Sequence, residues 1–166
     1  QLLSFIRKGE TSILEFKESL SLDIKKTEFG KDYSPKKEKY IEKNVLKTIV
    51  AFINSKGGTL LVGVRDDGFV KGINDELKCF HKGNEDNFLL YFKNLLKDKI
   101  GAKFYDFFDT NIVNVQGEKV LVVECNHSPA DPCFLDGEEF FVRTTPATDQ
   151  LIGAKMVEYI NIHFEK

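Results

Sequence analysis

Apolar residues recur every three to four positions in two segments of the chain, and this spacing predicts two amphipathic helices. In 39–58 the apolar stripe ends at Gly57, a residue suited to closing a helix, and its members are Ile41, Val45, Ile49 and Ile53. In 85–101 the inward positions are Phe88, Phe92, Leu95, Leu96 and Ile100. Two further helices are predicted near the chain ends, over 2–9 and 149–164.

Other segments alternate apolar and polar residues, or are almost wholly apolar, and these predict strands. In 12–20 Leu14 and Phe16 point one way and Glu15 and Lys17 the other. Segment 59–64, "TLLVGV", reads as a strand buried on both faces, and "DDG" then turns the chain into a hairpin with 69–73. Three more extended segments are predicted at 103–115, 118–126 and 134–144.

This order mixes helices with hairpins. It predicts a single α/β (α+β) domain over 1–166, whose mixed, mainly antiparallel sheet is packed by three to four helices. Residues 19–39 have no hydrophobic period and are rich in Ser, Lys, Asp, Gly and Pro, so they predict a long mobile loop.

The composition is that of an ordinary globular domain, with 42% hydrophobic and 12% aromatic residues. No apolar run reaches the roughly 18 residues of a membrane span, so we expect no membrane partner. Cys79, Cys125 and Cys133 form no CxxC pair, which favours a reducing cytoplasm over a disulfide scaffold. Because the chain starts at Gln1 rather than Met, we expect it to be part of a longer protein.

Charge is spread unevenly along the chain. The net charge is −2, but residues 1–103 carry 20 lysines and arginines against 15 acids, whereas 104–149 carry 2 against 9. Such a chain could present one positive face to a polyanion. The alternative is that the charge is uneven but fully solvated.

Several kinds of site are disfavoured by the order of residues. "NSKGGTLLVG" places its glycines after a helix and before a strand, the reverse of a phosphate-binding loop, which argues against ATP. Cys125, His127 and Cys133 supply three zinc ligands where a structural site uses four. No Ser or Cys stands in a nucleophile-elbow context.

Three carboxylates are better candidates for chemistry. Glu10 precedes the first strand, Glu15 lies inside it, and Asp66 follows the buried strand. If the two strands are neighbours, the three side chains could converge on Mg²⁺ or Mn²⁺. Glu10 and Glu15 are five residues apart, so they can share a site only if the chain bends near Thr11 and Ser12. The alternative is ordinary turn chemistry and a solvated strand face.

Three quoted segments together resemble the Schlafen AlbA-like domain, a family once described as a divergent AAA domain. They are "ETSILEFKES", "AFINSKGGTLLVGVRDDGFVKGI" and "FFVRTTPATDQL". Their order and spacing match the family pattern over residues 3–162. The resemblance implies a compact α/β domain that binds nucleic acid and serves as the N-terminal module of a bacterial regulator or defence protein, with fused C-terminal domains.

The resemblance also implies a possible activity. Related vertebrate cores cleave transfer and ribosomal RNA with a divalent metal and three acids, whose positions fall here on Glu10, Glu15 and Asp66. The vertebrate zinc ligands are missing from "KFYDFF" and reduced to Cys133, so we expect no zinc. Those proteins clasp RNA between two lobes, and this single lobe would need a homodimer or a further domain to do so.

Three functional hypotheses follow. The first is a nucleic-acid-binding module, for DNA or RNA, whose candidate phosphate contacts are Lys17, Lys56, Arg65 and Arg143. The second is a metal-dependent endoribonuclease that uses the three carboxylates with Mg²⁺ or Mn²⁺, with Lys17 near the scissile phosphate. The third is a protein-interaction or ligand-sensing domain that uses the acidic C-terminal half.

Overall fold

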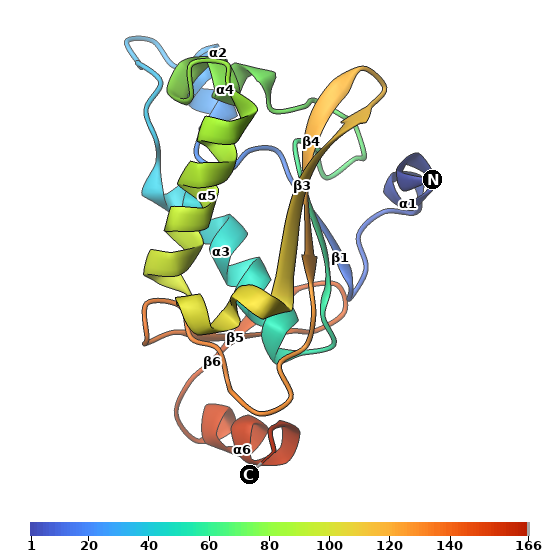
Figure 1. The fold of residues 1–166 in the computed structure, drawn as a ribbon, viewed down its shortest axis with the longest axis vertical. Coiled ribbons are helices and arrows are strands. Elements are labelled where there is room, and N and C mark those ends of the chain that lie inside the picture. Colours follow the sequence, from blue (N-terminus) through green and yellow to red (C-terminus); the bar gives the residue numbers. More distant parts are fainter. Residues whose placement is uncertain (166) are drawn as a thin grey trace.

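A four-stranded mixed sheet forms the centre of the molecule (Figure 1). The computed structural model describes residues 1–165. The strand order is β1 (Leu14–Lys17), β2 (Gly58–Val62), β4 (Glu118–Cys125) and β3 (Phe108–Val115). β1 runs parallel to β2, and the other pairs are antiparallel. The predicted mixed, mainly antiparallel α/β fold is confirmed.

One face of the sheet is covered by the two strongly periodic helices (Figure 1). They are α3 (Lys39–Asn54) and α5 (Glu85–Lys99), and both predicted helices are therefore confirmed. Their apolar stripes form the main core with the inward side chains of β2 and β4. Helix α1 (Leu2–Lys8) packs on the opposite face, where Ile6 joins a smaller cluster with Leu14 and Phe16.

A second, two-stranded sheet lies against the end of α3. It consists of β5 (Phe140–Arg143) and β6 (Thr148–Leu151), followed by α6 (Gly153–His163). The buried amide of Asn54 links it to α3: Nδ2 donates to the carbonyls of Cys133 (2.8 Å) and Phe141 (3.0 Å), and Oδ1 accepts from the Cys133 N–H (2.8 Å). A third apolar cluster with Phe140, Val142 and Phe164 seats α6.

Gly57 and Gly58 serve backbone packing at the start of β2. A Cβ on Gly57 would stand 2.5 Å from the Cys125 carbonyl oxygen, and Gly57 has φ +75°. A Cβ on Gly58 would meet the Phe52 ring at 2.5 Å. The glycine pair therefore follows a helix C-terminus and fits against β4 and α3.

Several segments differ from their predicted structure. The hairpin predicted between 59–64 and 69–73 is reduced to an isolated bridge between Val64 and Val70. Residues 19–39, predicted as a loop, contain α2 (Ile24–Phe29), and residues 19–22 are buried. The segment 103–115 begins with a 3-10 helix, η1 (Ala102–Phe107). In 134–144 only β5 is a strand, and the predicted terminal helix is preceded by β6. Helix α4 (Asn74–Phe80) raises the total within residues 1–165 to six α-helices and one 3-10 helix, above the predicted three to four.

The buried part of 19–39 is held by a distant carboxylate. Glu76 of α4 is 1% exposed and accepts hydrogen bonds from the N–H groups of Leu20 (2.9 Å, to Oε2) and Ser21. This contact joins residues more than fifty positions apart, so local periodicity does not indicate it. Among residues 1–165, no helix combines the length and the apolar character needed to cross a bilayer.

Candidate nucleic-acid interface

The chain folds back on itself just before β1. Thr11 and Leu14 form an isolated bridge, with the Thr11 N–H donating to Leu14 O (2.9 Å) and the Leu14 N–H donating to Thr11 O (3.4 Å). The reversal brings Glu10 alongside the strand, where its Oε1 accepts the Phe16 N–H (2.9 Å). The bend that Glu10 and Glu15 need in order to share a site is therefore present.

Glu10 and Glu15 form a carboxyl pair whose pKa values are shifted in opposite directions. Burial, a hydrogen bond with Glu15 and the charges of Glu15 and Asp66 raise the pKa of Glu10 to about 7. Burial pushes the pKa of Glu15 upward, but hydrogen bonds from Glu10 and Arg143 and the charge of Lys17 outweigh it, so the pKa of Glu15 is lowered. Below about pH 7 Glu10 thus carries the proton of the pair, and Glu15 carries the charge.

Arg143, at the end of β5, is the partner of Glu15. Its Nη1 lies 2.6 Å from Glu15 Oε1 and 3.0 Å from Thr148 Oγ1. Nη2 donates to Thr11 O (2.7 Å) and Nε to Ser12 O (3.3 Å). The guanidinium carbon also lies 4.9 Å from the centre of the Phe52 ring.

This network changes the role that the sequence suggests for Arg143. Its side chain is only 2% exposed, and its N–H groups are directed at oxygens of the protein. A phosphate contact would require these bonds to be exchanged. As placed, Arg143 fixes the bend at Thr11 and Ser12 and holds the Glu15 carboxylate.

Asp66 lies in the exposed turn after β2, next to the carboxyl pair. It lines a cleft of about 320 Å³ together with Gly9, the neighbour of Glu10, and its charge contributes to the raised pKa of Glu10. The three predicted carboxylates are therefore gathered in one region. As arranged, they do not form a ligand set, because residues 1–165 contain no group of three or more His, Cys, Asp or Glu side chains placed to hold a metal ion.

The remaining predicted cations lie at three different places. Lys56, just after α3, lines a cleft of about 620 Å³. Lys17 ends β1, where its charge acts on Glu15, and Arg65 stands in the turn beside Asp66 with its guanidinium carbon 4.8 Å from the centre of the Phe69 ring. Within residues 1–165 none of the three forms an ion pair, so each is available to an external anion.

The cleft beside Lys56 joins several elements, and we refer to it as the Lys56 cleft. It lies between the bend before β1, the end of α3, the end of β5 and helix α6; its lining residues are Ser12, Asn54, Ser55, Lys56, His127, Arg143, Thr145, Tyr159 and His163. Arg143 thus connects the cleft to the carboxyl pair. Of the four predicted phosphate contacts, Lys56 and Arg143 share this cleft.

Sequence reasoning missed the aromatic part of the Lys56 cleft. Tyr159 and His163 stack with ring centres 3.8 Å apart and planes at 15°. The Tyr159 hydroxyl donates to Asn54 O (2.9 Å), which fixes the pair against the end of α3. The signal was an aromatic residue and a histidine four positions apart on a predicted helix, a spacing that brings side chains together on one face.

The two buried cysteines belong to the hydrophobic core. Cys125 and Cys133 are both within the main core, and burial raises the pKa of the Cys133 thiol to about 12. Burial raises the pKa of Cys125 as well. Both thiols are therefore protonated, as expected of small buried apolar side chains.

Comparison with known proteins places this architecture in a family. Over 93% of its length the chain resembles the DIP2311 protein from Corynebacterium diphtheriae, with a TM-score of 0.54 and 19% identity, and it spans 25% of that protein. It is also similar, with a TM-score of 0.45 and 18% identity, to the N-terminal domain of a RecG-related protein from Nitrosomonas europaea, over 92% of this chain and 87% of that one. The first likeness supports the fold. The family model described as "Schlafen, AlbA_2" matches residues 10–151, and the chain belongs to that family.

Proposed function

We propose that this chain is a nucleic-acid-binding module and that the Lys56 cleft is its binding site. The observation that carries the proposal is the gathering of an unpaired ammonium group, two imidazoles and several hydroxyls around one open cleft. Lys56 supplies a point charge for a phosphate, and Ser12 and Thr145 supply hydroxyl donors. Membership of the Schlafen AlbA_2 family supports the same conclusion.

The chemistry of the cleft suits a phosphodiester with an attached base. The stacked rings of Tyr159 and His163 offer a flat surface beside the ammonium group of Lys56. Base stacking on aromatic rings and backbone contacts to lysine are the two recurring components of nucleic-acid binding without sequence specificity. The overall charge of −2 does not oppose such binding, because affinity depends on the local charge at the site.

Salt-dependent binding tests this function. Fluorescence anisotropy with duplex DNA and with structured RNA, over a range of salt concentrations, should show affinity that falls as salt rises. Lys56→Ala should weaken binding and reduce the salt slope by about one unit. Lys78→Ala is the matched control, because Lys78 is exposed on α4, distant from α6 in Figure 1. Absence of salt-dependent binding at low ionic strength, or equal effects of the two variants, would contradict the proposal.

A second candidate function is a metal-dependent endoribonuclease, and a specific observation favours it. The fold gathers Glu10, Glu15 and Asp66 although they come from a bend, a strand and a turn. An ion of the Mg²⁺ or Mn²⁺ type would need Asp66 to move in and Glu10 to lose its proton, because the three do not form a ligand set as they stand. Lys17 lies two residues after Glu15, and its charge lowers the pKa of that carboxyl.

Incubation of the protein with transfer RNA and Mn²⁺ or Mg²⁺ separates the two functions. Cleavage that is lost in Asp66→Ala but retained in Asp67→Ala would support the nuclease, since both residues are exposed in the same turn. Intact RNA with every metal, together with salt-dependent binding, would contradict the nuclease and favour the nucleic-acid-binding module. A role within a longer regulator or defence protein, as an N-terminal module, is part of the same proposal; the chain spans about a quarter of the DIP2311 protein.

A further inference from the structure

Strand β3 is an open edge of the central sheet. It is eight residues long and pairs only with β4 within residues 1–165. The two strands are joined by a two-residue turn at Gln116 and Gly117, both with positive φ. The strand carries neither Lys nor Pro, which are the residues that most often protect an exposed edge from pairing.

Hydrogen bonds to β4 alternate along β3, and this alternation shows which backbone N–H and C=O groups do not bond β4. The Asn126 N–H donates to Phe107 O (2.6 Å), and Val115 faces Glu118 across the tight turn. In an antiparallel ladder the residues that bond the neighbour alternate, so the odd-numbered positions bond β4. The N–H and C=O groups of Thr110 and Ile112 therefore point outward, whereas the Phe108 N–H donates to Tyr105 O at the end of η1.

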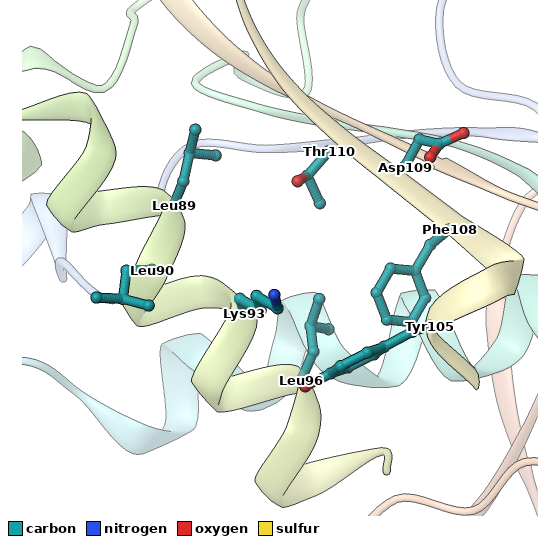
Figure 2. A pocket seen from close by; sticks show the side chains of 8 residues that line it. All are labelled: Leu89, Leu90, Lys93, Leu96, Tyr105, Phe108, Asp109 and Thr110. Atoms are coloured by element: carbon teal, nitrogen blue, oxygen red, sulfur yellow. The ribbon is translucent and has the colours of Figure 1, made fainter. Parts of the chain in front are cut away.

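A groove of about 450 Å³ runs along this edge, between β3 and α5 (Figure 2). We call it the β3 groove; Leu89, Leu96 and Phe108 give it apolar walls, and Tyr105 lies at one end. Figure 2 shows Phe108 and Thr110 on the α5 side of the strand and Asp109 on the other side. An extended segment placed here would meet backbone groups along one side and apolar side chains along the other.

The charge on the α5 side of the β3 groove identifies the kind of segment, because Asp109, which also lines the groove, lies on the other side of the strand (Figure 2). Lys93 of α5 lines the groove, with its ammonium group 5.9 Å from the centre of the Tyr105 ring, and it forms no ion pair within residues 1–165. Pairing of two copies through β3 would place α5 of each copy on the same face of a continuous sheet and bring their Lys93 side chains toward one gap. An acidic side chain from a partner neutralises Lys93, whereas a second copy adds a like charge.

We propose that the β3 groove binds an extended segment of a partner protein by β-strand addition. The segment pairs with the outward backbone groups of Thr110 and Ile112. It directs alternate apolar side chains into the groove and an acidic side chain toward Lys93. This surface is distinct from the Lys56 cleft, so the domain could hold a protein partner and a nucleic acid at once.

Selection of peptides tests this inference. A phage-displayed library of random nonapeptides would be selected on the whole chain, and the consensus peptide synthesised for titration against wild type and three variants. Thr110→Pro removes an outward N–H without removing a bond to β4 and should weaken binding at least about tenfold. Thr110→Val keeps that N–H and should stay within about twofold. Lys93→Glu should weaken binding about tenfold and favour a peptide whose acid is replaced by Lys.

Thermal unfolding of each variant separates lost binding from lost folding, and Lys93→Glu gives a test independent of the strand backbone. A consensus with alternating apolar residues and an acid, sensitive to both Thr110→Pro and Lys93→Glu, supports the proposal. Failure to enrich any peptide, or a consensus bound equally by all variants, overturns it. A dimer in sedimentation velocity that Thr110→Pro abolishes also overturns it, because the occupant would then be a second copy.

Discussion

The two edges of the central sheet are built in opposite ways. At β1 the outward backbone groups are bonded by the chain itself: Leu14 pairs with Thr11, and the Phe16 N–H donates to Glu10. At β3 the outward groups of Thr110 and Ile112 have no such partner within residues 1–165. The edge with four residues is closed, and the edge with eight is open.

The closed edge coincides with the candidate chemistry. The bend at 10–12 covers the outer edge of β1 and supplies Glu10. Arg143, from the second sheet, holds this bend by hydrogen bonds. A carboxyl pair needs fixed positions, and a strand edge whose outward N–H groups are bonded within the chain provides them. Lys93, Tyr105 and Asp109 line the groove at the open edge, with Asp109 on the side of β3 away from α5 (Figure 2), and the free backbone groups of this edge suit pairing with another chain. We therefore propose the closed edge for chemistry and the open edge for assembly.

Removal of Arg143 should break the closed edge, and we expect the largest effect from it. Arg143→Ala leaves Glu15 buried without its partner and frees the carbonyls of Thr11 and Ser12. Breaking a buried ion pair on one side typically destabilises a protein by about 3–5 kcal/mol, and these side chains are 2% and 11% exposed. Urea unfolding would measure the loss.

Arg143→Lys is the matched variant, because it keeps the charge but not the fork that reaches several acceptors at once. It should fall between wild type and Arg143→Ala. A loss below about 1 kcal/mol in Arg143→Ala would mean that the bend at Thr11 is held by other contacts.

The elements that were predicted correctly are those whose own hydrophobic pattern determines their structure. The stripes of α3 and α5 and the apolar run of β2 gave correct elements because each buries its own apolar face. The burial of residues 19–22 was missed because Glu76, from a distant helix, satisfies the backbone of Leu20 and Ser21. Helix α2 was missed because it buries none of its residues and so has no apolar stripe. The short 3-10 helix η1 was read as a strand, since its aromatic residues have high strand propensity.

The candidate site shows the same division. The need for a bend at Thr11 and Ser12 follows from the odd spacing of Glu10 and Glu15, and the structure has that bend. The role of Arg143 does not follow from any spacing, because its partner Glu15 lies 128 residues away. A lone cation in an acidic segment suggested an external anion. In the folded chain the anion that Arg143 binds is the Glu15 carboxylate.

The second prediction concerns the proton at the closed edge. The pKa of Glu10 is raised above the usual value of a glutamate to about 7, so between about pH 4.5 and 7 the folded chain binds more protons than the unfolded chain. Its contribution to stability is present at pH 5 and is lost as the pH rises through 7. The melting temperature of wild type should therefore fall, relative to Glu10→Gln, between pH 5 and pH 8.

Glu10→Gln is the matched reference because its side chain keeps an oxygen that can accept the Phe16 N–H but cannot ionise. Other groups with shifted pKa, such as buried Glu76 and His81, remain in both proteins and cancel in the difference. Parallel pH curves for the two proteins would show that Glu10 does not hold a proton shared with Glu15.

The prediction with the smallest expected effect compares the backbone N–H groups of the two edges directly. Amide hydrogen exchange should be slow at Phe16, whose N–H is bonded to Glu10, and faster by at least about tenfold at Thr110, after correction for intrinsic rates. Glu10→Ala should accelerate exchange at Phe16 and leave Thr110 unchanged. The consensus peptide should slow exchange at Thr110 and Ile112 and leave Phe16 unchanged. Equal protection of Phe16 and Thr110 in the free protein would mean that the two edges are alike in solution, and the separation of chemistry from assembly would lose its structural basis.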